Sequence, residues 1–296
     1  MGVVSLNLPQ IGILARHSEK RFFEILDKRL KLVEKALLLR YELLKNVTSD
    51  VSPIHWQHGA IARLKKGESI AKFLKGGYAT ISMGYIGMYE ATKLITGESN
   101  TGEKGRVFAM KVMDRLNEAI DTWKKRHNMG FALYGTPAES LTNRFSSLDR
   151  ARFGEIEDIT DKGYYTNSYH VNVREEINVF DKFAFESEFQ KKSTGGCISY
   201  AEIPNMTNNI PAVLTMIKYI YDNISYAEFN TKSDYCHVCG FDGEIKVNDN
   251  NDWECPRCHN TDRDKLTVIR RTCGYLGENF WNEGRTKEIK DRVMHI

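Results

Sequence analysis

RRTCGYLG, residues 270–277, follows a short apolar run typical of a β-strand. Its two glycines, Gly274 and Gly277, flank a tyrosine and a leucine. Glycine has no Cβ, so Gly274 can take backbone angles closed to other residues and lets neighbouring backbone approach closely. The Gly274 Cα could also carry a radical, because it lies between a donating nitrogen and a withdrawing carbonyl and can become planar. For an isolated Gly-x-x-Gly, a tight turn is the simpler interpretation.

The octet and the C-terminal segments GRTKEI (284–289) and RVMH (292–295) resemble the glycyl-radical loop and C-terminus of anaerobic (class III) ribonucleotide reductases. The resemblance extends over essentially the whole chain. It implies a ten-stranded α/β barrel with the radical loop inserted into its lumen, and a glycyl radical at Gly274. Other glycyl-radical enzymes, such as formate lyases, match less well, because a four-cysteine site and the loop TPAES (136–140) point to the reductases.

Composition bounds the class of protein. The chain has 296 residues, of which 41% are hydrophobic and 27% charged, as in soluble globular proteins. A net charge of +3 does not indicate a polyanion-binding surface. We expect no signal peptide and no membrane span, since no basic start precedes an apolar core and no apolar window is long enough. Six cysteines, four of them in CxxC pairs, indicate a reducing compartment, and we expect the cytoplasm.

Strand-like and helical patterns alternate along the first 230 residues, which predicts an α/β fold. The expected strands are 2–8, 78–83, 131–134, 164–171 and one beginning at 194, and the expected helices are 18–45, 88–94, 105–127 and 210–223. We expect three regions: the C-terminal half of a catalytic barrel over residues 1–230, a zinc ribbon over 231–265, and a radical loop with its tail over 266–296. A strand at residue 2 suggests that the chain begins within a fold.

Two glycine-bearing segments follow expected strands and lead into helices, where backbone amides can hold phosphate. Gly84 and Gly87 form one, although close packing explains a glycine turn equally well. In the other, Thr136 suits a helix N-cap and Pro137 a first helical turn. The resemblance implies that this second loop receives the substrate phosphate. The substrate-binding residues expected from both segments are Gly84, Gly87, Tyr134, Thr136, Ala138 and Ser140.

Two further residues are expected at the reaction site by resemblance alone. Asn7 and Glu139 match positions associated with the reductases that use formate as reductant. The resemblance places Glu139 near the sugar or the reductant; a carboxylate near a phosphate is unfavourable unless it faces another way. The resemblance also implies that the thiyl-radical cysteine lies upstream of Met1. Cys197 is most simply a small buried residue.

Cys236-x-x-Cys239 and Cys255-x-x-Cys258 are separated by fifteen residues, which is typical of a four-thiolate zinc site. Four protein ligands leave no position for water, so the ion is expected to be structural. Zinc ribbons also occur in nucleic-acid-binding proteins. Residues 231–265, however, include five Lys or Arg and eight Asp or Glu residues. A ribbon with this net negative charge repels phosphates, which argues against nucleic-acid binding.

These observations predict the glycyl-radical-bearing C-terminal part of an anaerobic ribonucleoside-triphosphate reductase. The resemblance implies four partners: an N-terminal half with the thiyl cysteine and allosteric sites, a separate activase with an iron–sulfur cluster and S-adenosylmethionine, ribonucleoside triphosphates, and a second copy in a homodimer. No nucleic acid polymer and no membrane is expected. Two alternatives remain open: a spare-part protein that repairs a damaged glycyl-radical enzyme, and a zinc-ribbon binding module.

Overall fold

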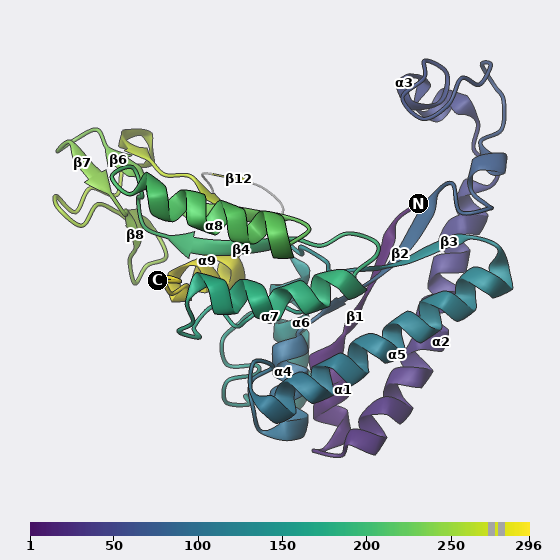
Figure 1. Cartoon of the computed structure of the whole chain (residues 1–296), viewed down its shortest axis with the longest axis horizontal. Coiled ribbons are helices and arrows are strands. Elements are labelled where there is room, and N and C mark those ends of the chain that lie inside the picture. Colours follow the sequence, from purple (N-terminus) through teal and green to yellow (C-terminus); the bar gives the residue numbers. More distant parts are fainter. Residues whose placement is uncertain (272–275, 278–281) are drawn as a thin grey trace.

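The computed structural model describes residues 1–271, 276–277 and 282–296, which form an α/β structure (Figure 1). Gly274 lies outside the described residues. The helices are α1 (Leu8–Ala15), α2 (Glu19–Leu44), α3 (Pro53–Trp56), α4 (Met88–Thr96), α5 (Glu103–His127), α6 (Leu141–Phe153), α7 (Val179–Lys192), α8 (Ile210–Asn223) and α9 (Glu283–Asp291). The strands are β1 (Val3–Asn7), β2 (Thr80–Ile86), β3 (Gly130–Tyr134), β4 (Ser199–Ile203), β5 (Ala227–Thr231), β6 (Asp234–Cys236), β7 (Phe241–Gly243), β8 (Lys246–Val247), β9 (Trp253–Glu254), β10 (Leu266–Thr267), β11 (Arg270–Arg271) and β12 (Leu276–Gly277).

A parallel sheet with the strand order β1-β2-β3 organises the first part of the chain. Side chains alternate between the two faces of a strand. Leu6, Met83 and Leu133 lie on the face that packs in the main hydrophobic core. The opposite face carries the residues that flank these in each strand, among them Ser5 and Gly84, which are partners in the register. One face is therefore apolar and packs in the main core, and the other carries small and polar residues, such as Ser5, Ser82 and Gly84, with Ile86 at the end of β2 in a separate hydrophobic cluster.

Helices α2 and α5 cover the apolar face and lie side by side in Figure 1. Helix α2 buries an apolar stripe with helical spacing, and Ser18 caps its start by accepting a hydrogen bond from the Arg21 N–H. Phe22 of α2 meets Phe108 of α5 edge to face, with ring centroids 5.1 Å apart. The helices expected from the sequence at these positions are confirmed within two residues at each end.

The second unit is the parallel pair β4-β5, with a separate core shared with α7 and α8. Phe183 of α7, Ala201 of β4 and Met216 of α8 are buried in this core. Helix α8 spans the predicted residues 210–223.

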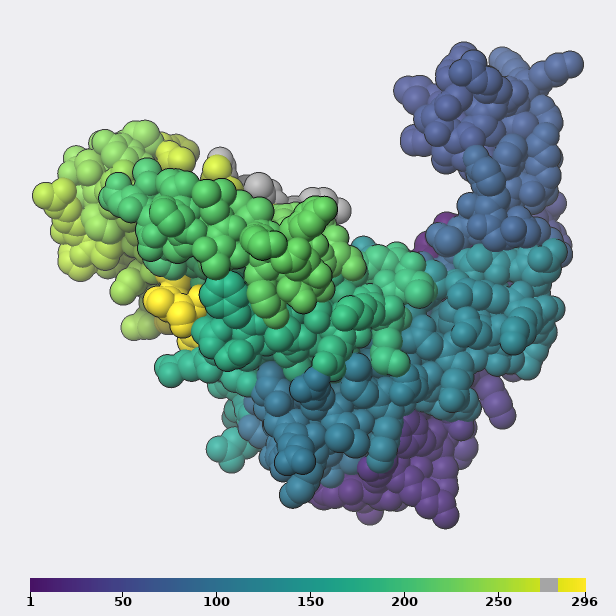
Figure 2. Space-filling model, in the orientation of Figure 1, coloured from purple at the N-terminus to yellow at the C-terminus, as the bar shows by residue number. Residues whose placement is uncertain are grey.

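The C-terminal region consists of short strands and helix α9. Strand β6 pairs antiparallel with β7 and β10, while β8 pairs with β9 and β11 with β12. Its small core includes Cys236, Cys255, Trp253 and Ile289 of α9. Figure 2 shows this lobe, with α8, standing on one side of a hollow and the segment around α3 on the other.

Two expectations change. Residues 164–171 do not form a strand. Their β-type pairing is a single isolated bridge between Ile86 and Asn167. The reason is that this segment caps α4, since the carbonyls of Thr166 and Ser168 accept the N–H groups of Gly87 and Met88. In addition, the described strands form separate small sheets, so the α/β class is confirmed whereas the ten-stranded barrel is not seen. Across the described ranges, none of the helices has the length and apolarity to cross a membrane.

Candidate functional site

The carboxyl ends of β1, β2 and β3 meet at one edge of the sheet, because the strands are parallel. In open α/β sheets ligands bind in the crevice outside these ends. Asn7 ends β1, Gly87 follows β2, and the loop 135–140 follows β3. Asn7, Gly87 and the loop 135–140 thus lie at this edge, while Gly84 lies within β2, paired with Ser5 and Tyr134.

Gly84 and Thr136 are brought into direct contact on the small-residue face of the sheet. A Cβ built on Gly84 would lie 2.0 Å from Thr136 Oγ1 and 2.7 Å from Ser5 Oγ. The two hydroxyl oxygens are 3.5 Å apart, and Thr136 Oγ1 also donates to the Tyr134 carbonyl at 3.3 Å. Gly84 is therefore required for the close approach of Ser5 in β1 and Thr136 in the loop after β3. Of the two interpretations open from the sequence, phosphate binding and close packing, this contact explains Gly84 by close packing.

Backbone conformation and packing also explain why residue 87 is a glycine. Its φ of +80° is in the left-handed region, and an added Cβ would lie 2.2 Å from Pro9 Cγ. Its N–H donates to the Thr166 carbonyl at 2.9 Å, and the Met88 N–H to that of Ser168 at 3.1 Å. The first amides of α4 are thus engaged within the chain, so the geometry favours the packing role of Gly87 over phosphate binding.

The loop after β3 differs from the prediction. Pro137 and Thr136 do not begin a helix, because α6 begins at Leu141 with Ser140 at its N-cap position. The Ala138 N–H donates to Asn167 Oδ1 at 3.0 Å, and the Ala138 carbonyl accepts from Arg285 Nη2 at 2.6 Å. These partners, distant in sequence, hold residue 138 in a non-helical loop, and a local capping rule cannot anticipate them.

Asn7 is held at both ends of its amide. Its Oδ1 accepts from the Gln10 N–H at 3.1 Å and caps α1, while its Nδ2 donates to Asp149 Oδ2 at 2.8 Å. Asp149 is fully buried and also accepts from Gln10 Nε2 at 2.7 Å and from the Tyr165 hydroxyl at 3.0 Å. Burial, with the Asp149 carboxylate beside it, raises the pKa of Tyr165, so its phenol remains a donor.

Asp149 and Tyr165 are functional candidates that the sequence did not indicate. They lie far along the chain from Asn7, and no local motif contains them. Glu139 is half-buried, and its carbonyl accepts from Asn282 Nδ2 at 3.2 Å. This contact joins the candidate substrate loop to the residue that caps α9.

Four cysteine sulfurs form the second candidate site. The Sγ atoms of Cys236, Cys239, Cys255 and Cys258 all lie within 4.8 Å of one another, with Cys236–Cys258 at 3.7 Å and Cys239–Cys255 at 3.6 Å. Ligands about 2.3 Å from a tetrahedral zinc ion are separated by about 3.8 Å, so these sulfurs fit one ion.

The four thiols perturb one another. Burial raises the pKa of Cys236, but the N–H groups of Cys239 and Val238 outweigh it and lower that pKa to about 7. Burial, with the Cys255 and Cys236 side chains, raises the pKa of Cys239, and, in spite of the Asn260 N–H, burial with the other cysteines raises the pKa of Cys258 to about 12. His237 and His259, adjacent to the ligands in sequence, bond elsewhere: His237 to Thr267 Oγ1 and His259 to Glu254. The cluster is therefore compatible with a closed, four-thiolate structural site.

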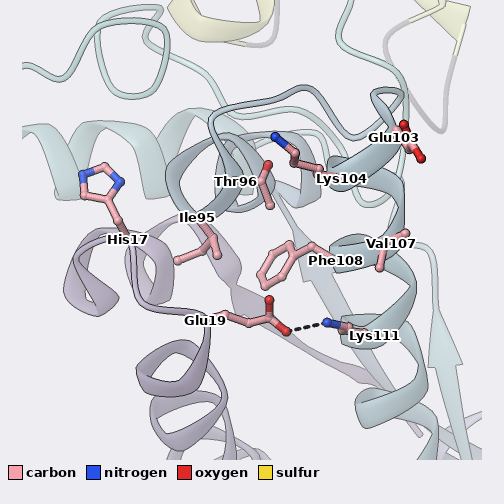
Figure 3. Close-up of a pocket in the computed structure, with 9 residues that line it drawn as sticks. All are labelled: His17, Glu19, Ile95, Thr96, Glu103, Lys104, Val107, Phe108 and Lys111. Carbon is pink, nitrogen blue, oxygen red and sulfur yellow. Dashed lines mark hydrogen bonds and ion pairs between the residues drawn. The ribbon is translucent and has the colours of Figure 1, made fainter.

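Two cavities lie near the helices and strands of the first part of the chain. A cavity of about 580 Å³ lies between the start of α2 and helices α4 and α5, where Glu19 pairs with Lys111 at 2.8 Å (Figure 3). Its lining includes none of the predicted site residues. A second, of about 350 Å³, lies beside β1 and is lined by Ser5, Asn7 and Gln10. This second cavity is the one that adjoins the candidate site.

Comparison with known proteins identifies the family. The model for the family described as "Anaerobic ribonucleoside-triphosphate reductase" matches residues 1–295, so the chain belongs to that family. It is 40% identical over 302 residues to the anaerobic ribonucleoside-triphosphate reductases of Salmonella typhimurium and Escherichia coli, and 39% identical over 303 residues to that of Enterobacteria phage T4. These matches cover 100% of this chain but 42%, 42% and 48% of the relatives, so the chain spans less than half of their length.

Solved structures agree on the fold. An anaerobic ribonucleotide reductase matches with a TM-score of 0.74 and 23% identity, over 99% of this chain and 44% of that one. The Thermotoga maritima anaerobic ribonucleotide reductase, in complex with dATP and CTP, matches with a TM-score of 0.66 and 24% identity, over 93% and 42%.

Proposed function

We propose that this chain is the glycyl-radical-bearing part of an anaerobic ribonucleoside-triphosphate reductase, which converts ribonucleotides to deoxyribonucleotides in the cytoplasm. The observation that carries the proposal is the family match to residue 295, because it runs through the RRTCGYLG segment and the C-terminal motif. The four-cysteine cluster holds a structural zinc ion. Strand β10 pairs with β6 of the ribbon, and β11 follows it directly toward Gly274.

The proposed chemistry begins with removal of one hydrogen atom from the Gly274 Cα by a separate activase, which uses an iron–sulfur cluster and S-adenosylmethionine. The glycyl radical takes a hydrogen atom from a cysteine thiol in the remaining part of the enzyme. The resulting thiyl radical takes the ribose 3′-hydrogen, and the protonated 2′-hydroxyl leaves as water. Formate is oxidised to carbon dioxide and supplies two electrons and one proton, so that C2′ gains a hydrogen in place of the lost hydroxyl, and the cysteine thiol then returns the hydrogen atom to C3′.

Substrate is proposed to bind at the carboxyl ends of β1–β3. Thr136, with Tyr134 and Gly84, lines the small-residue face of the sheet, and Asn7 lies at its edge. Because the Ala138 amide is engaged by Asn167, the phosphates would meet the turn at Ser140, where the N-terminus of α6 carries partial positive charge. Asn7 and Glu139 are proposed to lie near the sugar and the reductant.

The relatives are more than twice as long as the part that this chain matches. The proposed partner corresponds to their remaining part, an N-terminal half with the thiyl cysteine and the allosteric sites. β1 is an edge strand, and beside it runs an exposed apolar stripe of α2, with Leu32, Leu39 and Leu43 at 54%, 61% and 71% exposure. Exposed strand edges and apolar stripes require cover. Strands of the N-terminal half would continue the sheet at β1 and complete the ten-stranded barrel, and the assembled enzyme would form a homodimer.

Reconstitution tests the proposal. This chain is mixed anaerobically with a chain carrying the N-terminal half, the activase, formate and a ribonucleoside triphosphate, and deoxyribonucleotides are measured. We expect product only when both halves are present, and none with Gly274→Ala. Product formed by this chain alone would contradict the proposal. Restoration only of an enzyme that is already cleaved at its own radical glycine would indicate the spare-part alternative.

A further inference from the structure

A row of four buried, charged side chains joins the C-terminal helix to the rest of the molecule. Arg285 and Arg292 both pair with Glu288, and Arg292 Nη1 also pairs with Glu202 of β4 at 3.1 Å. The Arg292 Nε to Glu288 distance is 2.9 Å. Each of these side chains is 5% exposed or less. Two positive and two negative groups thus form a neutral ladder across α9.

The ladder also holds backbone at two places that matter for the proposed function. Arg292 Nη1 donates to the Arg271 carbonyl at 2.8 Å, and Arg285 Nη2 donates to the Ala138 carbonyl at 2.6 Å. Arg271 is the last residue of β11, and Ala138 lies in the candidate substrate loop. One rigid set of contacts therefore ties the residue that leads toward Gly274 to α9, to β4 and to the candidate substrate loop.

The chemistry of arginine explains why a guanidinium occupies position 292. Its planar fork carries five N–H donors in a fixed geometry, so one side chain can reach Glu288, Glu202 and the Arg271 carbonyl together. A lysine carries three N–H donors on a single nitrogen, so it cannot make both the Nε contact with Glu288 and the Nη1 contacts with Glu202 and the Arg271 carbonyl in the positions that Arg292 does. A buried ion pair is weak evidence for stability, because apolar residues of similar volume are often at least as stabilising. The ladder instead fixes the positions of the Arg271 and Ala138 carbonyls relative to α9.

We propose that Arg292 is a positioning residue for the radical step: it fixes Arg271, the end of β11 and three positions before Gly274 in the sequence, against α9 and β4. This inference rests on the proposed function, because it assigns the radical to Gly274. The simpler alternative is that Arg292 contributes only to folding, as any buried ion pair would. The two roles predict different behaviour of matched variants.

The test compares Arg292→Met and Arg292→Lys with Lys162→Met in the full chain. Lys162 is a matched control, because it is 2% exposed and pairs with buried Glu90 at 2.9 Å, far along the chain from Arg271. Each variant is activated anaerobically, and radical spins per chain are counted by electron paramagnetic resonance. We expect about tenfold fewer spins for both Arg292 variants, with zinc content unchanged, and wild-type spins for Lys162→Met. Equal spin counts in Arg292→Met and Lys162→Met would overturn the inference, and so would full rescue by Arg292→Lys.

Hydrogen exchange gives a readout that does not depend on the radical. In wild type, the amides of residues 266–271 and 282–296 should be protected. Arg292→Met should accelerate exchange in both segments, whereas Lys162→Met should leave exchange at 266–271 unchanged. If wild type itself forms no radical, the proposed function fails, and the exchange comparison then shows only whether Arg292 holds the end of β11. Unchanged exchange at 266–271 in both Arg292 variants would show that Arg292 does not hold β11.

Discussion

The sheet of β1–β3 and the cysteine ribbon are stabilised in different ways within one chain. The sheet buries a large apolar core under α2 and α5, with Phe22, Leu26 and Met83 fully inaccessible. Among the residues that the structure describes, the ribbon core has six buried members, two of them cysteines of the metal cluster. A small region that buries little apolar surface depends on a metal or on crosslinks. The sheet should therefore fold without metal, and the ribbon should not.

Loss of the metal should have the largest effect. Structural zinc contributes about 10–16 kcal/mol in small domains, so Cys239→Ser should unfold residues from about 230 onward while leaving the sheet folded. Limited proteolysis and metal analysis would show this as cleavage within the ribbon and loss of about one zinc per chain. Cys197→Ser is the matched control, because Cys197 is a free thiol outside the cluster. Equal protease patterns for wild type and Cys239→Ser would contradict the claim that the ribbon depends on metal whereas the sheet does not.

A substitution in the apolar core of the sheet should destabilise the sheet and leave the ribbon and its zinc unchanged. Leu26→Ala removes a fully buried side chain of α2 and should lower the free energy of unfolding of the sheet by about 2–5 kcal/mol. Leu39→Ala, on the exposed face of the same helix, should change it by less than about 0.5 kcal/mol. Urea unfolding followed by tryptophan fluorescence measures both. Loss of zinc in Leu26→Ala would show that the two regions are coupled.

A smaller effect should follow from crowding at the candidate site. Gly84→Ala places a methyl group against Thr136 Oγ1, and this overpacking should cost about 1–3 kcal/mol. Thr136→Ala removes the clashing oxygen, so the double variant should regain part of that loss. Thermal unfolding of the four proteins gives the coupling energy. Additive effects of the two substitutions would mean that Gly84 and Thr136 are not in contact.

The smallest effect is expected from mild acid, within the first pH unit below 6.5, at the C-terminal tail. The His295 Nδ1 accepts the Glu202 N–H at 2.8 Å, and burial, with Lys182 and Arg292 nearby, lowers the pKa of His295 to about 3. The unfolded chain takes up a proton below pH 6.5 whereas the folded chain does not, so stability is lost as the pH falls below 6.5. The slope is about 1.4 kcal/mol per pH unit. His295→Asn keeps an acceptor but cannot titrate, and an unchanged acid slope in this variant would rule His295 out.

The same contrast explains how far the sequence could predict the structure. Helices α2, α5 and α8 and the cysteine cluster follow from spacing within one segment, and all were expected at these positions. The helix expected at Pro137 failed because Asn167 and Arg285, distant in sequence, hold the Ala138 backbone. Asp149 and Tyr165 went unpredicted for the same reason, since their contact with Asn7 exists only after folding.

The central claim, that this chain carries its radical on Gly274, is tested most directly by activating it anaerobically and then admitting air. A glycyl radical reacts with dioxygen, and the backbone breaks at that residue. We predict a radical signal by electron paramagnetic resonance, followed in air by a cut at Gly274 in mass spectrometry. Unactivated protein should stay intact, and Gly274→Ala should retain its zinc and show neither signal nor cut. A cut at Gly277 or Gly284, or a radical signal that survives in Gly274→Ala, would contradict the assignment.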